Sequence, residues 1–300
     1  MKLEGLFVPL ITPLNPDESL DEKGLARVIE YVLEGGADGV FVLGTAGEFA
    51  NLRRSTRERL VQATKALIGG QVPLLAGIGR AGTQETVEEG RRLARFGVDA
   101  FVAVPPYYYV HSQSELAAHF RAIAHALDVP LVLYNIPQFV KHTIDPETLA
   151  ELAEDSSVIG IKNTDQDMDA FARLLAIRDA HHDRFGVSQG DLPNAAECLL
   201  RGADGITLGV ASVAPRLCKE LYNAAKAGDR DRAEAINQQL MHLDPGGLSK
   251  SWFAGLKMLA SLLGLCAPTV ATPFEPCGQD DVDILRQRLA DVGLLPPTGG

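Results

Sequence analysis

One lysine, Lys162, follows directly on a short apolar run of the kind that forms a buried strand. The run is Val-Ile-Gly-Ile at 158–161, whereas lysine is a residue type that is mostly exposed. Burial disfavours the charged ammonium, and a neutral amine can attack a carbonyl carbon and form a Schiff base. In the alternative, structural interpretation, the aliphatic stem packs in the core and the ammonium reaches solvent. Position alone leaves both interpretations open.

Other polar groups also stand where apolar runs end. Tyr134 closes such a run, and its phenol could carry protons beside an amine or simply bond a backbone carbonyl. The segment Gly-Thr-Ala-Gly-Glu at 44–48 offers consecutive backbone N–H groups in a tight turn, which can hold a carboxylate. Two further segments, 105–109 and 189–191, also follow apolar runs. Together they predict one polar site, provided that the runs end at the same edge of a sheet.

The elements that would position these residues alternate along the chain. Amphipathic stretches, several of which end in Gly, separate eight apolar runs. Strands that are apolar on both faces and alternate with helices are typical of a parallel sheet covered by helices. Eight units predict closure into a (β/α)₈ TIM barrel, whose active site lies at the carboxyl ends of the strands. The predicted strands are 5–11, 39–44, 72–79, 100–106, 130–136, 158–162, 184–190 and 205–210.

Only helical patterns follow residue 211. The first, at 214–229, would complete the barrel. Three more, at 230–243, 251–264 and 280–293, predict a C-terminal helical extension packed on it. We therefore expect a barrel over residues 1–227 and an extension over residues 228–300.

Composition excludes several classes of protein. The net charge of −11, without any basic run, argues against nucleic-acid binding, and no apolar stretch reaches the ~18 residues that span a membrane. The four cysteines are scattered, which favours a reduced cytoplasm, and the histidines show no metal-ligand spacing. The segment at 77–82 matches G-x-G-x-x-G, but Asp99 precedes the next strand instead of ending it. We expect neither metal nor cofactor.

Taken together, the chain resembles the dihydrodipicolinate synthase / N-acetylneuraminate lyase superfamily of class I, pyruvate-dependent aldolases. The resemblance runs from end to end, and the combination of G-T-x-G-E, Y-N-x-P and G-x-K at these separations is specific. The matching segments are GLFVPLITP (5–13), GTAGE (44–48), PPYY (105–108), YNIP (134–137), GIK (160–162), GD (190–191), GADGI (202–206) and GLL (293–295).

The resemblance implies a role for each matched position. Lys162 would form a Schiff base with the keto carbon of pyruvate or another 2-keto acid, and Tyr134 would carry protons. Thr45 would link that phenol to Tyr108, which several members donate from a neighbouring subunit of a homotetramer built as a dimer of dimers. The turn containing Ala46 and Gly47 would bind the carboxylate. Two further residues, Gly190 and Ile206, would line the pyruvate pocket.

Departures from the family pattern bear on the substrate. Ala46 replaces a threonine whose hydroxyl helps to hold the carboxylate in many members. Phe139 stands where dihydrodipicolinate synthases place an arginine that grips the carboxylate of the aldehyde; Lys141 could substitute if that stretch is extended. Thr164 stands where sugar-acid aldolases present a hydroxyl to the substrate, although it could instead cap the next helix, with Asp167 three residues on.

These residues favour a cytoplasmic Schiff-base lyase that cleaves or forms a C–C bond between pyruvate and an aldehyde. The expected substrate is a 2-keto-3-deoxy sugar acid or a related 4-hydroxy-2-keto acid. Three alternatives remain. The first is 4-hydroxy-tetrahydrodipicolinate synthase of lysine biosynthesis, the second a sugar-acid dehydratase that uses the same lysine, and the third a non-catalytic keto-acid-binding protein.

Overall fold

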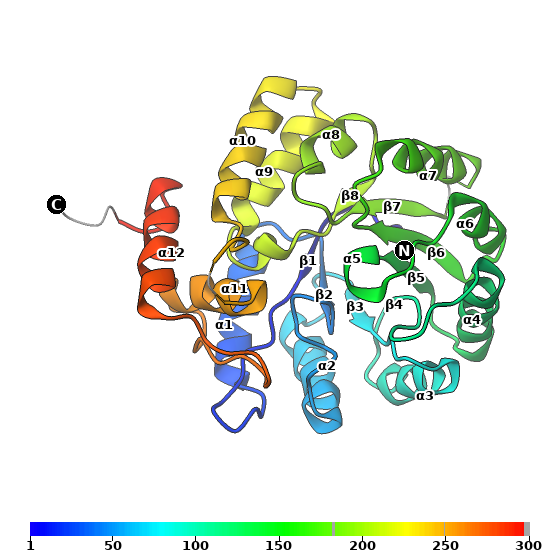
Figure 1. Cartoon of the computed structure of the whole chain (residues 1–300), viewed down its shortest axis with the longest axis horizontal. Helices are drawn as coiled ribbons and strands as arrows, with labels where there is room; N and C mark the ends of the chain where they lie inside the picture. Colours follow the sequence, from blue (N-terminus) through cyan, green and yellow to red (C-terminus); the bar gives the residue numbers. More distant parts are fainter. Residues whose placement is uncertain (182–183, 249, 297–300) are drawn as a thin grey trace.

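Eight parallel strands close into a barrel at the centre of the computed structural model, which describes residues 1–181, 184–248 and 250–296 (Figure 1). Neighbouring strands in the chain pair in order, and the last strand pairs with the first. The predicted barrel is confirmed. Its strands are β1 (Gly5–Pro9), β2 (Gly39–Val42), β3 (Leu74–Gly77), β4 (Ala100–Ala103), β5 (Leu131–Asn135), β6 (Val158–Asn163), β7 (Gly186–Gln189) and β8 (Gly205–Ile206).

Helices cover the outside of the barrel, and their sequences explain where they form. In the first helix, for example, Asp21 accepts a hydrogen bond from the Gly24 N–H, and Leu25, Val28 and Val32 are buried at helical spacing. The helices of the barrel are α1 (Glu22–Glu34), α2 (Arg54–Ile68), α3 (Thr83–Ala94), α4 (Gln113–Ala126), α5 (Pro137–Val140), α6 (Pro146–Ala153), α7 (Met168–Ala180), α8 (Ala195–Leu200), the 3₁₀ turn η1 (Gly209–Ser212) and α9 (Pro215–Lys226).

The predicted C-terminal helices are also present, as α10 (Arg230–Leu243), α11 (Trp252–Leu262) and α12 (Gln279–Asp291). They lie together on one side of the barrel (Figure 1). The predicted boundary at residue 227 falls between α9 and α10, but α10 packs along α8 and α9. The division into two domains therefore stays a prediction. No helix in the described ranges is long and apolar enough to cross a membrane.

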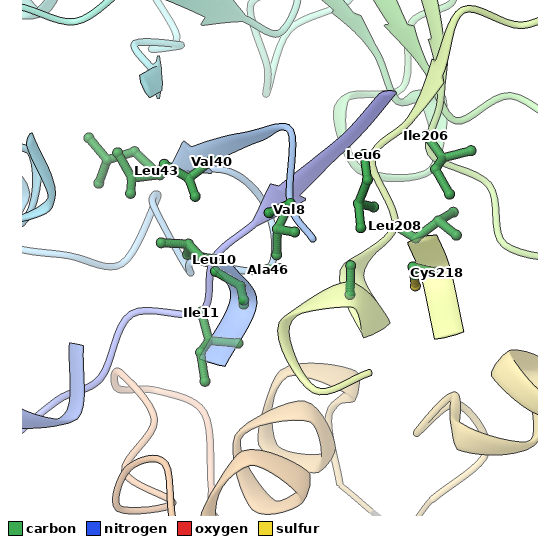
Figure 2. Close-up of a cluster of buried hydrophobic side chains, with 14 of the residues drawn as sticks. Leu6, Val8, Leu10, Ile11, Val40, Leu43, Ala46, Ile206, Leu208 and Cys218 are labelled. Atoms are coloured by element: carbon green, nitrogen blue, oxygen red, sulfur yellow. The ribbon is translucent and has the colours of Figure 1, made fainter. Parts of the chain in front are cut away.

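Side chains of the strands divide between two apolar layers. One layer fills the barrel and includes Phe7, Phe41 and Tyr134. The other lies between strands and helices, and Figure 2 shows part of it. Val158 and Gly160 pair with the adjacent residues Leu131 and Val132, so the intervening residue of β6 has no partner. This bulge shifts the alternation of inward-facing and outward-facing side chains along β6.

Candidate active site

The Lys162 side chain lies inside the barrel and forms part of the wall of a cavity at the carboxyl ends of the strands. The residue is 6% exposed, and its Nζ lies 4.0 Å from the centroid of the Tyr134 ring and 5.6 Å from that of Phe41. Tyr134 and Lys162 are register partners on β5 and β6, and their side chains therefore share a face. The described residues offer the ammonium no ion-pair partner. The site thus holds an amine among aromatic rings, open to the cavity.

Tyr134 connects Lys162 with the turn that follows β2. Its side chain is 3% exposed, and its Oη lies 3.3 Å from the hydroxyl of Thr45. The ring also packs edge-on against Phe41, with centroids 6.5 Å apart. A phenol in this position can exchange a proton with a group bound at the amine and with the threonine hydroxyl.

The turn at 44–48 includes two cavity-lining residues whose backbone N–H groups have no partner in the described part of the chain. Gly47 N donates to Gly44 O at 3.1 Å, and Glu48 N donates to Thr45 O at 2.9 Å. By contrast, the N–H groups of Thr45 and Ala46 donate to no group within the described part of the chain, and both residues line the cavity. Paired N–H groups of this kind can bind a carboxylate.

Gly47 does not line the cavity, and its residue type has a packing explanation. The Thr12 hydroxyl donates to its carbonyl at 2.8 Å, and an added Cβ would lie only 3.0 Å from Leu10 O. Glycine therefore permits the close approach of β1 to the turn. The Ala46 methyl joins the apolar cluster that contains Leu10 and Ile11 (Figure 2).

A cavity of about 250 Å³ brings together seven of the ten site residues that the sequence predicts. These are Thr45, Ala46, Tyr134, Phe139, Lys162, Thr164 and Gly190. They come from loops and strand ends that follow β2, β5, β6 and β7, which is the arrangement that a barrel imposes on residues distant in sequence.

Thr164 lines this cavity, and it does not cap a helix. Its Oγ1 is buried and has no hydrogen-bond partner in the described ranges. The cap of α7 is Asp167, whose carboxylate accepts from the N–H groups of Asp169 and Ala170 at 2.9 Å. A Cβ added to Gly190 would lie 2.7 Å from Lys162 Cε and 2.8 Å from Thr164 Oγ1. Glycine at 190 therefore leaves room for both side chains.

Phe139 lies on α5, at the border of the cavity. It is 58% exposed and packs against Phe253 of the C-terminal extension at 6.1 Å between centroids. The stretch is helical, not extended, and Lys141 ends it in the left-handed region with φ of +60°. Residues two apart in a helical turn point in different directions. Lys141 does not line the cavity, so the condition for its substituting for an arginine is not met.

Besides Gly47, two predicted residues lie away from the cavity within this chain. The Ile206 side chain is fully buried in the outer apolar layer, beside Leu6 and Leu208 (Figure 2). The next residue, Thr207, faces the cavity instead. Tyr108 is 81% exposed, with a φ of +91°, and packs against Tyr109 with centroids 5.0 Å apart.

Two carboxylates at the cavity had no predicted role. Asp191 is 5% exposed and accepts from Gln166 Nε2 at 3.0 Å and from Asn194 Nδ2 at 2.9 Å. Asp244 follows α10 and accepts from Trp252 Nε1 at 3.2 Å. Asp191 was inside a segment that the sequence singled out, but no pattern signalled that the extension would contribute Asp244 and Trp252. Among the described residues that line the cavity, Lys162 is the only cation.

A second cavity of about 390 Å³ adjoins the first and is mainly apolar. The two share Thr45, Ile136 and Phe139. The remaining aromatic residues that line it are Phe49, Tyr107, Phe253 and Phe274.

A parallel barrel with a buried lysine, a tyrosine and a threonine at its carboxyl end defines a Schiff-base lyase of the pyruvate aldolase class. The chain belongs to the dihydrodipicolinate synthetase family, whose model matches residues 2–291. It is 35% identical, over 98% of this chain and 95% of the relative, to an uncharacterized DapA-like lyase of Halobacterium salinarum. It is 33% identical to a 4-hydroxy-tetrahydrodipicolinate synthase of Gluconacetobacter diazotrophicus, over 97% of this chain and 98% of the relative.

Solved structures of the same family superpose over nearly the whole chain. Dihydrodipicolinate synthase from Thermotoga maritima matches with a TM-score of 0.93 and 28% identity, covering 98% of this chain and 100% of that one. A prophage protein of the family from Escherichia coli K12, solved in complex with pyruvate, matches with a TM-score of 0.92 and 27% identity. That match covers 98% of this chain and 99% of the other.

Proposed function

We propose that the protein is a lyase that cleaves or forms the C–C bond between pyruvate and a hydroxylated aldehyde, with a 2-keto-3-deoxy sugar acid or a related 4-hydroxy-2-keto acid as its substrate. The observation that carries this proposal is the unpaired Lys162 amine, 4.0 Å from the Tyr134 ring centroid, with Thr45 on the far side of the phenol.

The chemistry follows from these positions. The Lys162 amine attacks the keto carbon. The former carbonyl oxygen takes one proton from the amine nitrogen and a second from the Tyr134 phenol, and it leaves as water as the iminium forms. The substrate's 4-hydroxyl then gives its proton to the Tyr134 oxygen, and the electrons of the C3–C4 bond move into the iminium as the aldehyde departs. Protonation of the resulting enamine at C3 and addition of water release pyruvate and the amine. In the synthetic direction the same steps run in reverse.

The free backbone donors suit the carboxylate that every 2-keto acid carries. The N–H groups of Thr45 and Ala46 have no partners in the described chain, and both residues line the cavity. With alanine at 46, these two groups and the Thr45 hydroxyl supply the polar contacts that the turn can make. Donors held in place by a folded turn bind an anion without the cost of ordering a flexible side chain.

The far side of the cavity suits hydroxyl groups better than a second carboxylate. A buried carboxylate needs a cation or several donors, and this wall presents the carboxylates of Asp191 and Asp244 instead. Carboxylates accept hydrogen bonds from hydroxyls, and the unpartnered Thr164 hydroxyl can also donate to one. This charge pattern supports a polyhydroxylated substrate over aspartate semialdehyde, the aldehyde of the synthase alternative.

A second copy of the chain would complete the proton relay. Tyr108 lines neither of the two adjoining cavities that share Thr45, and it belongs to an exposed apolar run with Tyr109 and Val110. The apolar second cavity opens beside Thr45, where an incoming tyrosine could pack. We therefore include in the proposal that Tyr108 acts across an interface between subunits of a homotetramer.

A matched pair of variants tests the substrate class. Both Thr164→Val and Thr64→Val remove a buried hydroxyl that has no partner in the described residues, but Thr64 lies on α2 away from the cavity. A panel of 2-keto acids, with and without hydroxyls beyond C4, is assayed by pyruvate release. Thr164→Val should lower kcat/KM about tenfold for the hydroxylated acids only, and Thr64→Val should change neither group. No turnover of any hydroxylated acid by the unmodified protein would refute the proposal.

A further inference from the structure

A buried ion pair joins the C-terminal extension to the turn that carries Thr45. Lys257 of α11 is fully buried, Glu48 at the end of the turn is 4% exposed, and Lys257 Nζ lies 2.9 Å from Glu48 Oε1. Each partner makes a further polar contact. Lys257 Nζ donates to Thr269 O at 2.6 Å, and Glu48 Oε2 accepts from the Ala271 N–H at 2.7 Å. Ions so far from water persist only where such partners hold them in place.

The segment 269–272, which contacts both members of the pair, also bonds to the barrel through Thr272. The Thr272 N–H and hydroxyl both donate to Glu18 Oε1, at 3.1 and 2.7 Å. Asn51, three residues after Glu48, donates to Thr272 O at 3.3 Å. The extension therefore bonds to Glu48 within the turn and to Asn51 just beyond it.

The turn needs such an anchor because its backbone is strained. Glu48 has a φ of +57° and Leu43 a φ of +58°, which are left-handed conformations of residues other than glycine. Such conformations are unfavourable for residues that carry a Cβ, and they persist when the surroundings fix them. Between these two residues lie the Thr45 hydroxyl, which contacts Tyr134, and the free N–H groups of Thr45 and Ala46.

We propose that Lys257 is a positioning residue of the active site: through Glu48 it holds the turn at 44–48 in the strained conformation that presents its N–H groups to the substrate carboxylate. Lys257 does not line the cavity, so it acts without touching the substrate. The inference rests on the proposed function, because it assigns the carboxylate to this turn. It gives the helical extension a second part in substrate binding, in addition to the Asp244 and Trp252 side chains that line the cavity.

The test measures how much pyruvate is needed to form the Schiff base. The unmodified protein, Lys257→Met, Glu48→Gln and the double variant are treated with borohydride over a range of pyruvate concentrations. Intact mass gives the trapped fraction, and thermal unfolding gives stability. Arg178→Met is the control, because Arg178 pairs with the buried Asp204 at 2.9 Å at the opposite end of the barrel.

Lys257→Met should raise the half-saturating pyruvate concentration at least tenfold while the maximal trapped fraction stays high, because Lys162 is intact. When Glu48→Gln is already present, adding Lys257→Met should change the half-saturating pyruvate concentration less than twofold, because Lys257 acts through Glu48. Arg178→Met should lower the unfolding temperature and leave the half-saturating concentration unchanged.

The double variant decides the matter even if Lys257→Met fails to fold, because removing both charges of a buried pair is often neutral for stability. A half-saturating concentration raised at least fivefold in the folded double variant supports the proposal. A value within twofold of the unmodified protein would mean that the pair only balances charge, and would overturn it. If the unmodified protein itself traps no pyruvate, the proposed function fails and this inference falls with it.

Discussion

The Nζ of Lys162 lies 4.0 Å from the centroid of the Tyr134 ring, and the two residues are direct partners on neighbouring strands. This relationship places the amine and the phenol on the same wall of one cavity, 28 positions apart in the chain. The strand register fixes it, so it does not depend on a mobile loop.

Gly190→Ala should abolish most turnover while the barrel still folds. The added methyl would lie 2.7 Å from Lys162 Cε and 2.8 Å from Thr164 Oγ1, so the reactive side chain must move. A shift of this size in a reacting group can cost about 100-fold in rate. Gly278→Ala is the control, because a Cβ there meets nothing within 4 Å. Full activity of Gly190→Ala would show that the amine tolerates displacement.

The protein should strongly prefer a hydroxylated aldehyde to aspartate semialdehyde. Phe139, Asp191 and Asp244 offer the carboxylate of aspartate semialdehyde no cation, and Lys162, the only cation among the described lining residues, is taken up by the keto acid. A hydroxylated aldehyde needs no such cation. Losing a charge-assisted pair costs about 2–5 kcal/mol, so kcat/KM for a 2-keto-3-deoxy acid should exceed that for pyruvate plus the semialdehyde by at least about 100-fold.

Steady-state assays of the two reactions, side by side, check this preference. Phe139→Arg should reduce the difference in kcat/KM between the two reactions by improving the reaction with the semialdehyde, because a guanidinium can bind its carboxylate through two N–H groups. If the unmodified protein uses the semialdehyde equally well or better, the lysine-pathway function is restored.

Mixed oligomers should reveal whether Tyr108 acts across an interface. Tyr108→Phe and Tyr134→Phe should each be nearly inactive alone, since each removes one hydroxyl of the relay. After the two variants are unfolded and refolded together, some sites would combine an intact Tyr134 with an intact Tyr108 from the other chain. Partial recovery of activity is expected. Its absence, with subunit exchange verified by mass, would place Tyr108 in the site of its own chain.

Stability should fall on mild acidification because of one buried histidine. His119 on α4 is 4% exposed, and burial together with the charge of His111 lowers its pKa from 6.5 to about 4. Between these values the unfolded chain binds the extra proton and the folded protein does not. The free energy of unfolding should therefore decrease by up to about 3 kcal/mol as the pH falls from 6.5 to 4.

Chemical unfolding of the unmodified protein and of His119→Gln, across this pH range, measures the contribution. The variant should lose this part of the pH dependence, whatever its stability at pH 7. An identical slope in both proteins would show that His119 is already charged in the folded state.

The sequence was sufficient to predict the barrel because most of its strands are apolar on both faces and all eight alternate with helical stretches. It also placed Lys162, Tyr134 and Thr45 near one another, since each ends a strand and all parallel strands of a barrel end at one face. Their grouping needed no knowledge of side-chain packing. The three C-terminal helices were equally evident from their periodicity.

Other features depended on geometry that a linear pattern does not carry. β8 is only two residues long, which gave no alternation to show that Ile206 faces outward and Thr207 inward. The bulge in β6 likewise shifts its alternation. Phe139 and Lys141 follow a proline that could begin either a helix or an extended segment, and here it begins α5. The Glu48–Lys257 pair joins residues 209 positions apart through contacts that only the folded extension creates.

The central claim is that Lys162 is the nucleophile, and reductive trapping tests it most directly. The protein is incubated with pyruvate and borohydride, and intact mass followed by peptide mapping locates any adduct. We predict one reduced pyruvate adduct per chain on the peptide that contains Lys162, and none in Lys162→Ala, which should fold normally and lose turnover. An adduct on another lysine, or no adduct in the folded unmodified protein, would contradict the mechanism.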